Sequence, residues 1–347
     1  MKRRQLEITL EAAGKPAEQW ESSDGTRVLV LPHGGRVLGL FSPDNEENFF
    51  WTHPALANKE SAEAFYRGNQ WHNSGGDRTW VAPEVDFFFP DFPDLRRYWQ
   101  QRELDPGQYQ AARSNGILTW STRARLTLSR TKGAVDVEIT KSLFPALNPL
   151  RYEANAGLKS VSYAGYTLQT KLRVLGSAPS AIGLWQLVQM PHAGEMLIPT
   201  FSRSEPKLCM GAIADEDLPV SDRLVRYKMR AKGEHKLTMR AATITGRAGY
   251  IYAEGAASAL VIRNFRVNPS GEYVDVPWSE TNDFGYSFQA CNVNGVLGEF
   301  SELEYHVAAI GGPTGAVAGV DESQLWAFRG TGEKILEIAR YLLSPEV

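Results

Sequence analysis

Residues 118–128 read LTWSTRARLTL, and their alternation decides the fold class. Apolar side chains such as Leu118 and Leu126 occupy most even positions, while threonine, serine and arginine fill the odd ones. A period of two places one row of side chains in a core and the other in water, which is typical of a half-buried β-strand. The same alternation returns in residues 135–140 and 166–174. The sequence therefore predicts a protein made mainly of long β-strands.

Other segments of strand-forming composition surround these three. Turn residues such as Lys132-Gly133 separate several of the strands, and this spacing suits antiparallel hairpins. Strands do not alternate with helices along the chain, which disfavours a parallel α/β sheet. The further strands are expected at residues 26–31, 36–41, 182–189, 237–244, 258–267, 284–291 and 300–309.

Helical signals are few. Residues 56–67 have the composition of a short helix, and residues 332–343 repeat apolar side chains at helical spacing after Thr331, a residue suited to cap a helix. Residues 85–110 are rich in proline and aromatic residues and predict a long ordered loop. No linker interrupts the chain, so we predict one domain over residues 1–347. It should be a mainly β protein, a β-supersandwich of antiparallel strands with a few short helices.

Composition excludes several classes of protein. The hydrophobic fraction of 43% is enough for a core and argues against disorder. The net charge of −3 gives no attraction to polyanions, so no nucleic-acid partner is expected. No apolar stretch reaches the roughly 18 residues that a membrane span needs, so we expect no membrane partner.

The start of the chain and its cysteines say little about the compartment. Residues 1–4 include three basic side chains, but no apolar region follows them, so we expect no secretory signal and leave the localisation open. Cys209 and Cys291 show no CxxC spacing, and isolated cysteines of this kind are more often small buried apolar residues than a disulfide.

The most unusual stretch is residues 69–91, NQWHNSGGDRTWVAPEVDFFFPD. Proteins bind sugars with aromatic faces under C–H groups and with polar side chains that bond the hydroxyls, and this stretch holds both. An alternative is a rigid turn in which Arg78 forms a salt bridge with Glu84 or Asp86. The candidate substrate-binding residues here are Trp71, His72, Arg78, Trp80 and Glu84.

A second candidate stretch is residues 184–199, LWQLVQMPHAGEMLIP. Trp185 and Gln186 lie near the end of an expected strand, and His192 lies in the turn that follows. We take Trp185 and Gln186 as candidate ligand-binding residues and His192 as a candidate catalytic residue. The alternative for His192 is a solvated histidine in a turn.

A third stretch is residues 300–306, FSELEYH. Alternation places Glu302, Glu304 and His306 on one face of the expected strand. Such groups are costly to bury unless they are paired or used, so Glu304 is a candidate general base and His306 a candidate partner. Repulsion from Glu302 would raise the pKa of Glu304 toward neutral pH. The alternative is an exposed edge strand with solvated charges.

Other familiar chemistries leave no trace in the sequence. There is no GxSxG, HExxH or P-loop pattern, and no spacing typical of metal ligands. We therefore expect no cofactor and no metal site, although carboxylates in a wet cleft could hold Ca²⁺ without a recognisable spacing.

Four segments, in this order, make the chain resemble the galactose-mutarotase-like superfamily, and specifically a bacterial branch of it. They are LPHGGRVLGLF at 31–41, GGDRTWVAPE at 75–84, FSELEYH at 300–306 and QLWAFRG at 324–330. The resemblance implies a β-supersandwich with a sugar cleft on one sheet and an aldose 1-epimerase-like isomerase activity. The partner would be a small-molecule carbohydrate.

The resemblance also implies roles for particular residues. Glu304 matches the base that takes the anomeric hydroxyl proton, and Arg78 approximately matches an arginine that bonds sugar hydroxyls. Where the superfamily has its acid histidine, this chain has Trp185 and Gln186, so His192 or His72 would have to take that role. The alternative is a carbohydrate-binding protein without catalytic activity.

Overall fold

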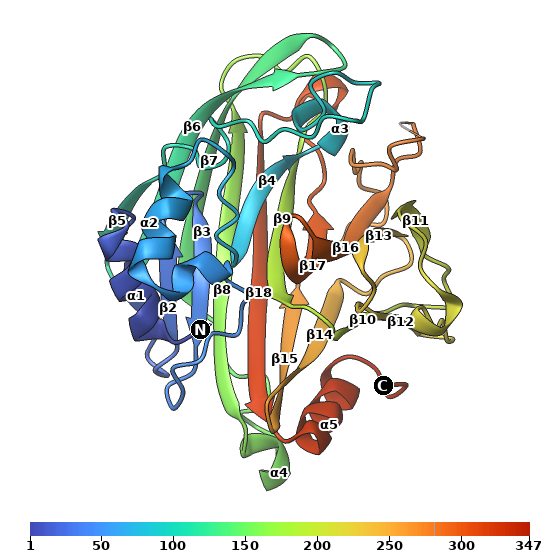
Figure 1. Ribbon diagram of the computed structural model, residues 1–347. Coiled ribbons are helices and arrows are strands. Elements are labelled where there is room, and N and C mark those ends of the chain that lie inside the picture. Colours follow the sequence, from blue (N-terminus) through green and yellow to red (C-terminus); the bar gives the residue numbers. More distant parts are fainter. Residues whose placement is uncertain (281) are drawn as a thin grey trace.

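The computed structural model describes residues 1–280 and 282–347 and contains two large antiparallel sheets (Figure 1). The first sheet has the order β1-β2-β3-β4-β9-β17-β16-β13-β11, and the second has the order β12-β10-β14-β15-β18-β8-β7-β6-β5. This arrangement confirms the mainly β fold class and the antiparallel sandwich. The first sheet consists of Glu18–Glu21 (β1), Arg27–Leu31 (β2), Arg36–Phe41 (β3), Asp77–Ala82 (β4), Gly183–Pro191 (β9), Lys207–Met210 (β11), Gly233–Arg240 (β13), Tyr286–Gly295 (β16) and Gly298–His306 (β17).

The strands of the second sheet include the three with the clearest alternation in the sequence. In β6 every second residue is buried, from Leu118 to Leu128, as the period of two predicts. The second sheet consists of Gln110–Ser114 (β5), Ile117–Leu128 (β6), Gly133–Pro145 (β7), Ser162–Val174 (β8), Glu195–Pro199 (β10), Leu224–Lys228 (β12), Arg247–Glu254 (β14), Ala257–Asn264 (β15) and Ala318–Gly330 (β18).

The two sheets enclose the main hydrophobic core. Val188 of β9 and Leu303 of β17 meet Leu168 of β8 and Val261 of β15 there, all at most 1% exposed. We call the face of the first sheet that carries Val188 and Leu303 the inner face. The opposite face of that sheet, which carries the intervening residues of the same strands, is the outer face.

Helices cover the outside of both sheets. Arg3–Ala12 (α1) and Lys59–Arg67 (α2) lie together beside β2 and β3 (Figure 1) and bury apolar side chains against these strands. Gly332–Leu342 (α5) packs against the second sheet. The Thr331 side chain caps this helix, as predicted, by accepting a hydrogen bond from the first turn of α5. The remaining helical segments are Pro54–Ala57 (η1), Glu84–Phe87 (α3), Ala156–Lys159 (α4), Asp215–Asp217 (η2) and Gly312–Thr314 (η3).

Three differences from the predicted elements have local causes. The helix predicted at 56–67 is divided, because Asn58 is extended and its side chain caps α2 by accepting from the Ser61 amide. The strand predicted at 237–244 begins earlier and ends at Arg240, after a register irregularity at Met239. Helix α1 was not predicted, since no side chain caps its first turn. None of the described helices combines the length and apolar character needed to cross a membrane.

Candidate functional site

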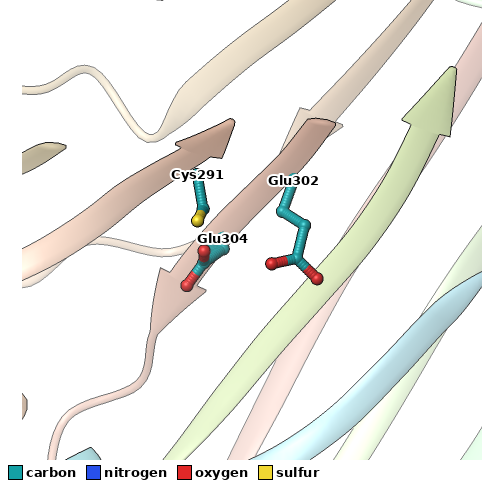
Figure 2. Close-up of side chains that lie close together, drawn as sticks. All are labelled: Cys291, Glu302 and Glu304. Carbon is teal, nitrogen blue, oxygen red and sulfur yellow. The ribbon is translucent and has the colours of Figure 1, made fainter. Parts of the chain in front are cut away.

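The site is built around β17, which lies between β9 and β16 in the middle of the first sheet. Glu302, Glu304 and His306 share its outer face, and their exposed fractions are 6%, 1% and 1%. Figure 2 shows Glu302 and Glu304 beside Cys291 of β16, which pairs directly with Glu302. The strand is therefore neither at an edge nor solvated, and the alternative of an exposed edge strand is wrong.

Strand β4 brings Arg78 to the same face. The Gly75-Gly76 turn before it has positive φ at both residues, and a Cβ on Gly76 would lie 2.4 Å from the backbone oxygen of Val37. Glycine is therefore required for the chain to enter the sheet here. Arg78 Nη2 lies 2.9 Å from Glu302 Oε1, so its ion-pair partner is Glu302.

This pairing corrects the salt bridge proposed from the sequence. Arg78 reaches β17 instead of Glu84 or Asp86, and Asp86 forms its own ion pair with Arg130 at 2.7 Å. Arg78 therefore does not form the rigid turn with local salt bridges that was the alternative.

Two tryptophans hold Arg78 in place. The guanidinium lies 4.1 Å from the ring centre of Trp80 and 5.7 Å from that of Trp71, which are cation–π distances. Both indole nitrogens donate to Asp105 Oδ2 at 3.0 Å, and Arg36 pairs with the same oxygen at 2.7 Å. Asp105 thus orients both tryptophans.

Lys236 of β13 is the central cation of the site. Its ammonium lies 3.2 Å from Glu304 Oε2 and 3.4 Å from Glu84 Oε2, and it lies 4.5 Å above the Trp185 ring centre. Burial lowers the pKa of Lys236, but the surrounding carboxylates of Glu304, Glu84 and Asp275 outweigh burial, and the pKa lies well above its usual value. The group is therefore a charged ammonium.

Glu304 has the properties of a group that exchanges protons near neutral pH. The pKa of Glu304 is raised to about 7: burial is the largest cause, Lys236 opposes it, and Glu302 and Glu84 also contribute to the increase. Repulsion from Glu302 thus contributes, as expected from the sequence, but burial is the larger cause. Trp185 Nε1 donates to Glu304 Oε2 at 2.8 Å, while Oε1 has no hydrogen-bond partner in the described part of the chain.

Two loop segments cover this face. Glu84, at the start of α3, accepts hydrogen bonds from the Tyr98 hydroxyl and from Trp278 Nε1, both at 2.9 Å. Asp275, in the same segment as Trp278, accepts from Gln289 Nε2 at 2.7 Å. The long loop predicted at 85–110 and residues 275–278, which precede β16, therefore meet above the site.

Several buried polar atoms on the outer face have no hydrogen-bond partner among the residues that the structure describes. Such atoms are costly, and a cluster of them marks a place where a ligand or water belongs. They are Arg78 Nε and Nη1, Gln189 Oε1, Gln289 Oε1, Glu304 Oε1 and both ring nitrogens of His306. Burial and the charge of Lys236 hold the pKa of His306 well below its usual value, so its 3.5 Å contact with Asp275 is not an ion pair.

The structure does not bring three of the predicted residues to this group. Gln186 projects from the inner face of β9 and contacts Thr79 at 2.6 Å and Asp321 at 3.2 Å. His192 contacts Asn292 Oδ1 at 2.9 Å. Asn292 is the neighbour of Cys291 in β16 and therefore projects from the opposite face.

His72 lies near α2, away from β17. Its Nε2 is 3.1 Å from the Gly68 oxygen, and its Nδ1 is 3.4 Å from His33 Nε2. Of the predicted residues, the outer-face site thus contains Arg78, Trp80, Glu84, Trp185, Glu304 and His306, with Trp71 at its border.

Sequence reasoning missed several members of the site. Lys236 lies just before the strand predicted at 237–244, so its face was not assigned. Tyr98, Asp275 and Trp278 lie in loops without periodicity, and no sequence signal marks them. Gln289 lay inside the strand predicted at 284–291, and its alternation with Phe288 could have placed it on a polar face.

Among the described residues, one group of three could offer ligands to a metal ion. Atoms of Cys291, Glu302 and Glu304 all lie within 4.8 Å of one another (Figure 2). The two carboxylates already have cations, Arg78 for Glu302 and Lys236 for Glu304. A metal ion would have to displace or repel these two buried cations, so the group does not fit a metal ion as it stands.

Known structures share this fold. A candidate aldose 1-epimerase from Escherichia coli K12 gives a TM-score of 0.54 over 91% of this chain and 99% of its own, with 8% identity. A galactose mutarotase-like protein from Lactobacillus casei ATCC 334 gives 0.50 over 90% and 100%, with 8% identity. A galactose mutarotase related enzyme from Lactobacillus acidophilus gives 0.50 over 91% and 97%, with 9% identity.

No protein-family model matches the sequence, and no curated protein matches it at a significant level. At these identities the likeness shows that the chain shares the fold of these proteins, which is the fold that the resemblance implied. Activity has to be argued from the site itself.

Proposed function

We propose that the protein is an aldose 1-epimerase-like isomerase that binds a sugar on the outer face of the first sheet. The observation that supports this most is Glu304: a buried carboxyl with a pKa of about 7, one oxygen fixed by Trp185 and Lys236, and the other free. A general base works best when its pKa lies near the working pH.

In this proposal Glu304 Oε1 accepts the proton of the anomeric hydroxyl. The hydroxyl oxygen forms the carbonyl as the bond between C1 and the ring oxygen breaks, and the electron pair of that bond moves to the ring oxygen. Lys236, which lies 3.2 Å from Glu304 Oε2, donates a proton to the ring oxygen. Rotation of the open aldehyde and the reverse steps give the other anomer: as the ring closes, its oxygen returns a proton to Lys236, and Glu304 gives its proton back to the C1 oxygen.

The remaining outer-face groups would bind the sugar. Arg78 Nε and Nη1 have no hydrogen-bond partner within residues 1–280 and 282–347 and can donate to sugar oxygens. Arg78 of β4 pairs with Leu187 of β9, and Leu187 pairs in turn with Glu304 of β17. The backbones that carry Arg78 and Glu304 are therefore separated by two strand spacings of about 4.8 Å each. A span of this size is comparable with a sugar ring.

The test is polarimetry on freshly dissolved single anomers of several aldoses. The parent protein should accelerate equilibration of at least one aldose, and Glu304→Gln should lower that rate by about 10²- to 10⁴-fold while binding is kept. Glu299→Gln, the same change at an exposed position of β17, is the matched control and should keep full rate. Full rate in Glu304→Gln would overturn the assignment of the base.

A carbohydrate-binding protein without catalysis is the second candidate. The positions of the histidines favour it, because His72 and His192 lie away from Glu304 and the buried His306 is neutral. If the parent binds an aldose but accelerates the equilibration of none, this second function replaces the first.

A further inference from the structure

We infer that the sugar is a 2-amino-2-deoxyaldose, held with its ammonium group beside the anomeric hydroxyl by free acceptors of the outer face. The inference rests on the proposed function and specifies the substrate class of the same site. Two independent observations carry it: an excess of buried carboxylates, and a set of unpartnered acceptor atoms on adjacent strands.

The charged groups that face the site do not balance. Each cation contacts a carboxyl group, but the carboxyl groups outnumber the cations by two, and His306 is neutral because of its lowered pKa. Burial raises the pKa of Glu84, Asp275 and Glu304, so a cationic group placed among them would favour their ionised forms. The half-buried Glu234, on the same face of β13, adds another carboxyl group near Glu302, and burial raises its pKa as well. The buried carboxylates are Glu84, Asp275, Glu302 and Glu304, and the buried cations are Arg78 and Lys236.

This excess decides which sugars fit. A uronic acid or a sugar phosphate would bring another negative charge into a buried, negatively charged space, which is strongly unfavourable. A neutral aldose would leave the excess as it is. An aldose with a protonated amine would reduce it, and charge-assisted hydrogen bonds to carboxylates are stronger than neutral ones.

The unpartnered acceptors match an ammonium group. Gln189 Nε2 donates to Glu302 Oε1 at 2.9 Å and Gln289 Nε2 donates to Asp275 Oδ2 at 2.7 Å, which fixes the orientation of both amides. Their Oε1 atoms are buried without a donor, as is Glu304 Oε1. An ammonium group has three donors and no acceptor, so it can satisfy such atoms without leaving a new one unpaired.

The strand register places the amine at C2 of the sugar. Gln289 of β16 pairs directly with Glu304 of β17. Side chains opposite each other in an antiparallel pair have Cβ atoms about 4.5–5.5 Å apart. In an aldose the C2 substituent is adjacent to the anomeric hydroxyl. With that hydroxyl on Glu304 Oε1, a C2 amine lies next to Gln289 Oε1, and the donors of Arg78 remain for the other oxygens.

The test is isothermal titration calorimetry of the parent protein with two matched series. One series is D-glucosamine, D-glucose and D-glucuronate, and the other is D-galactosamine, D-galactose and D-galacturonate. In one series at least, the amino sugar should bind about tenfold or more tightly than the neutral aldose, and the uronate more weakly than both. N-acetyl-D-glucosamine and N-acetyl-D-galactosamine carry no charge, so they should not bind more tightly than the neutral aldose.

Two further measurements separate charge from shape. Raising the pH above the pKa of the amine should remove the preference for the amino sugar. The neutral aldose, measured at the same pH values, shows how much of any change in affinity comes from titration of the protein. Gln289→Glu adds a negative charge at an acceptor position and should increase the preference. Asp91→Asn, which removes an exposed carboxylate of the covering loop, should leave the preference unchanged.

The outcomes distinguish this inference from the proposed function. If neutral aldoses bind and the amino sugars bind no better, the inference is overturned while the proposed function stands. If a uronate binds most tightly, the charge argument is wrong. If no member of either series binds, the inference and the proposed function both fail.

Discussion

The two faces of the first sheet both bury charged side chains, but only the inner face balances them. On the inner side Asp77 pairs with Arg263, and Asp321 accepts from the Tyr305 hydroxyl. Lys141 of β7 also points there, so two carboxylates face two cations. On the outer face the carboxyl groups outnumber the cations, which is the difference between the two faces. Buried charged groups therefore indicate a candidate site only where the numbers of carboxyl groups and cations differ.

The largest expected effect tests the balanced face. Asp77→Asn removes one partner of a fully buried ion pair and leaves Arg263 uncompensated, which should lower the free energy of unfolding by about 3–5 kcal/mol. Urea unfolding followed by tryptophan emission measures the change. Asp275→Asn on the outer face changes a carboxyl group whose only charge-pair contact among the described residues is the neutral His306, and it should cost less. Equal losses in the two variants would remove the distinction between the faces.

Lys236→Met is expected to lower the rate of mutarotation by about 10²-fold or more, because it removes the proposed proton donor. It also removes the cation that holds down the pKa of Glu304, so the pH at which activity appears should move upward. Polarimetry at several pH values gives both quantities. Lys232→Met, at an exposed position before β13, is the matched control; a similar loss there would argue against a specific role for Lys236.

The pH dependence should follow Glu304. The base must be deprotonated, so the rate should rise with pH through about 7. Stability should move in the opposite direction, because a carboxyl whose pKa is raised in the folded state binds its proton more tightly there than in the unfolded chain. The contribution of Glu304 to stability should therefore fall between about pH 4.5 and 7. Glu304→Gln should lack this contribution, and thermal unfolding at several pH values would show whether it does.

The smallest expected effect concerns the tryptophans. Trp80 supports Arg78 at 4.1 Å, so Trp80→Leu should weaken sugar binding by about two- to tenfold through the position of Arg78. Calorimetry with the tightest-binding sugar measures the change. Trp99→Leu, at a half-exposed position of the covering loop, should leave affinity within twofold of the parent. If Trp80→Leu also leaves affinity within twofold, Trp80 has no part in binding.

The sequence allowed the outer-face row of β17 to be predicted, because alternation alone separates Glu304 from Tyr305. It also allowed α5 to be predicted from spacing and its cap. The same alternation shows that Trp185 and Gln186, as neighbours in one strand, cannot face the same cleft, and the structure places Gln186 inside the sandwich. The pairing of Arg78 with Glu302 could not be predicted, since it depends on the order of strands in the sheet.

The central claim is that the outer face, and not the inner face, performs the chemistry. Two-dimensional exchange NMR of the best-binding aldose measures anomer interconversion at equilibrium in the parent, in Glu304→Gln and in Tyr305→Phe, which alter adjacent residues of β17 on opposite faces. We predict exchange cross-peaks between the anomers with the parent and with Tyr305→Phe, and none above the uncatalysed level with Glu304→Gln. Exchange that persists in Glu304→Gln and disappears in Tyr305→Phe would contradict the account.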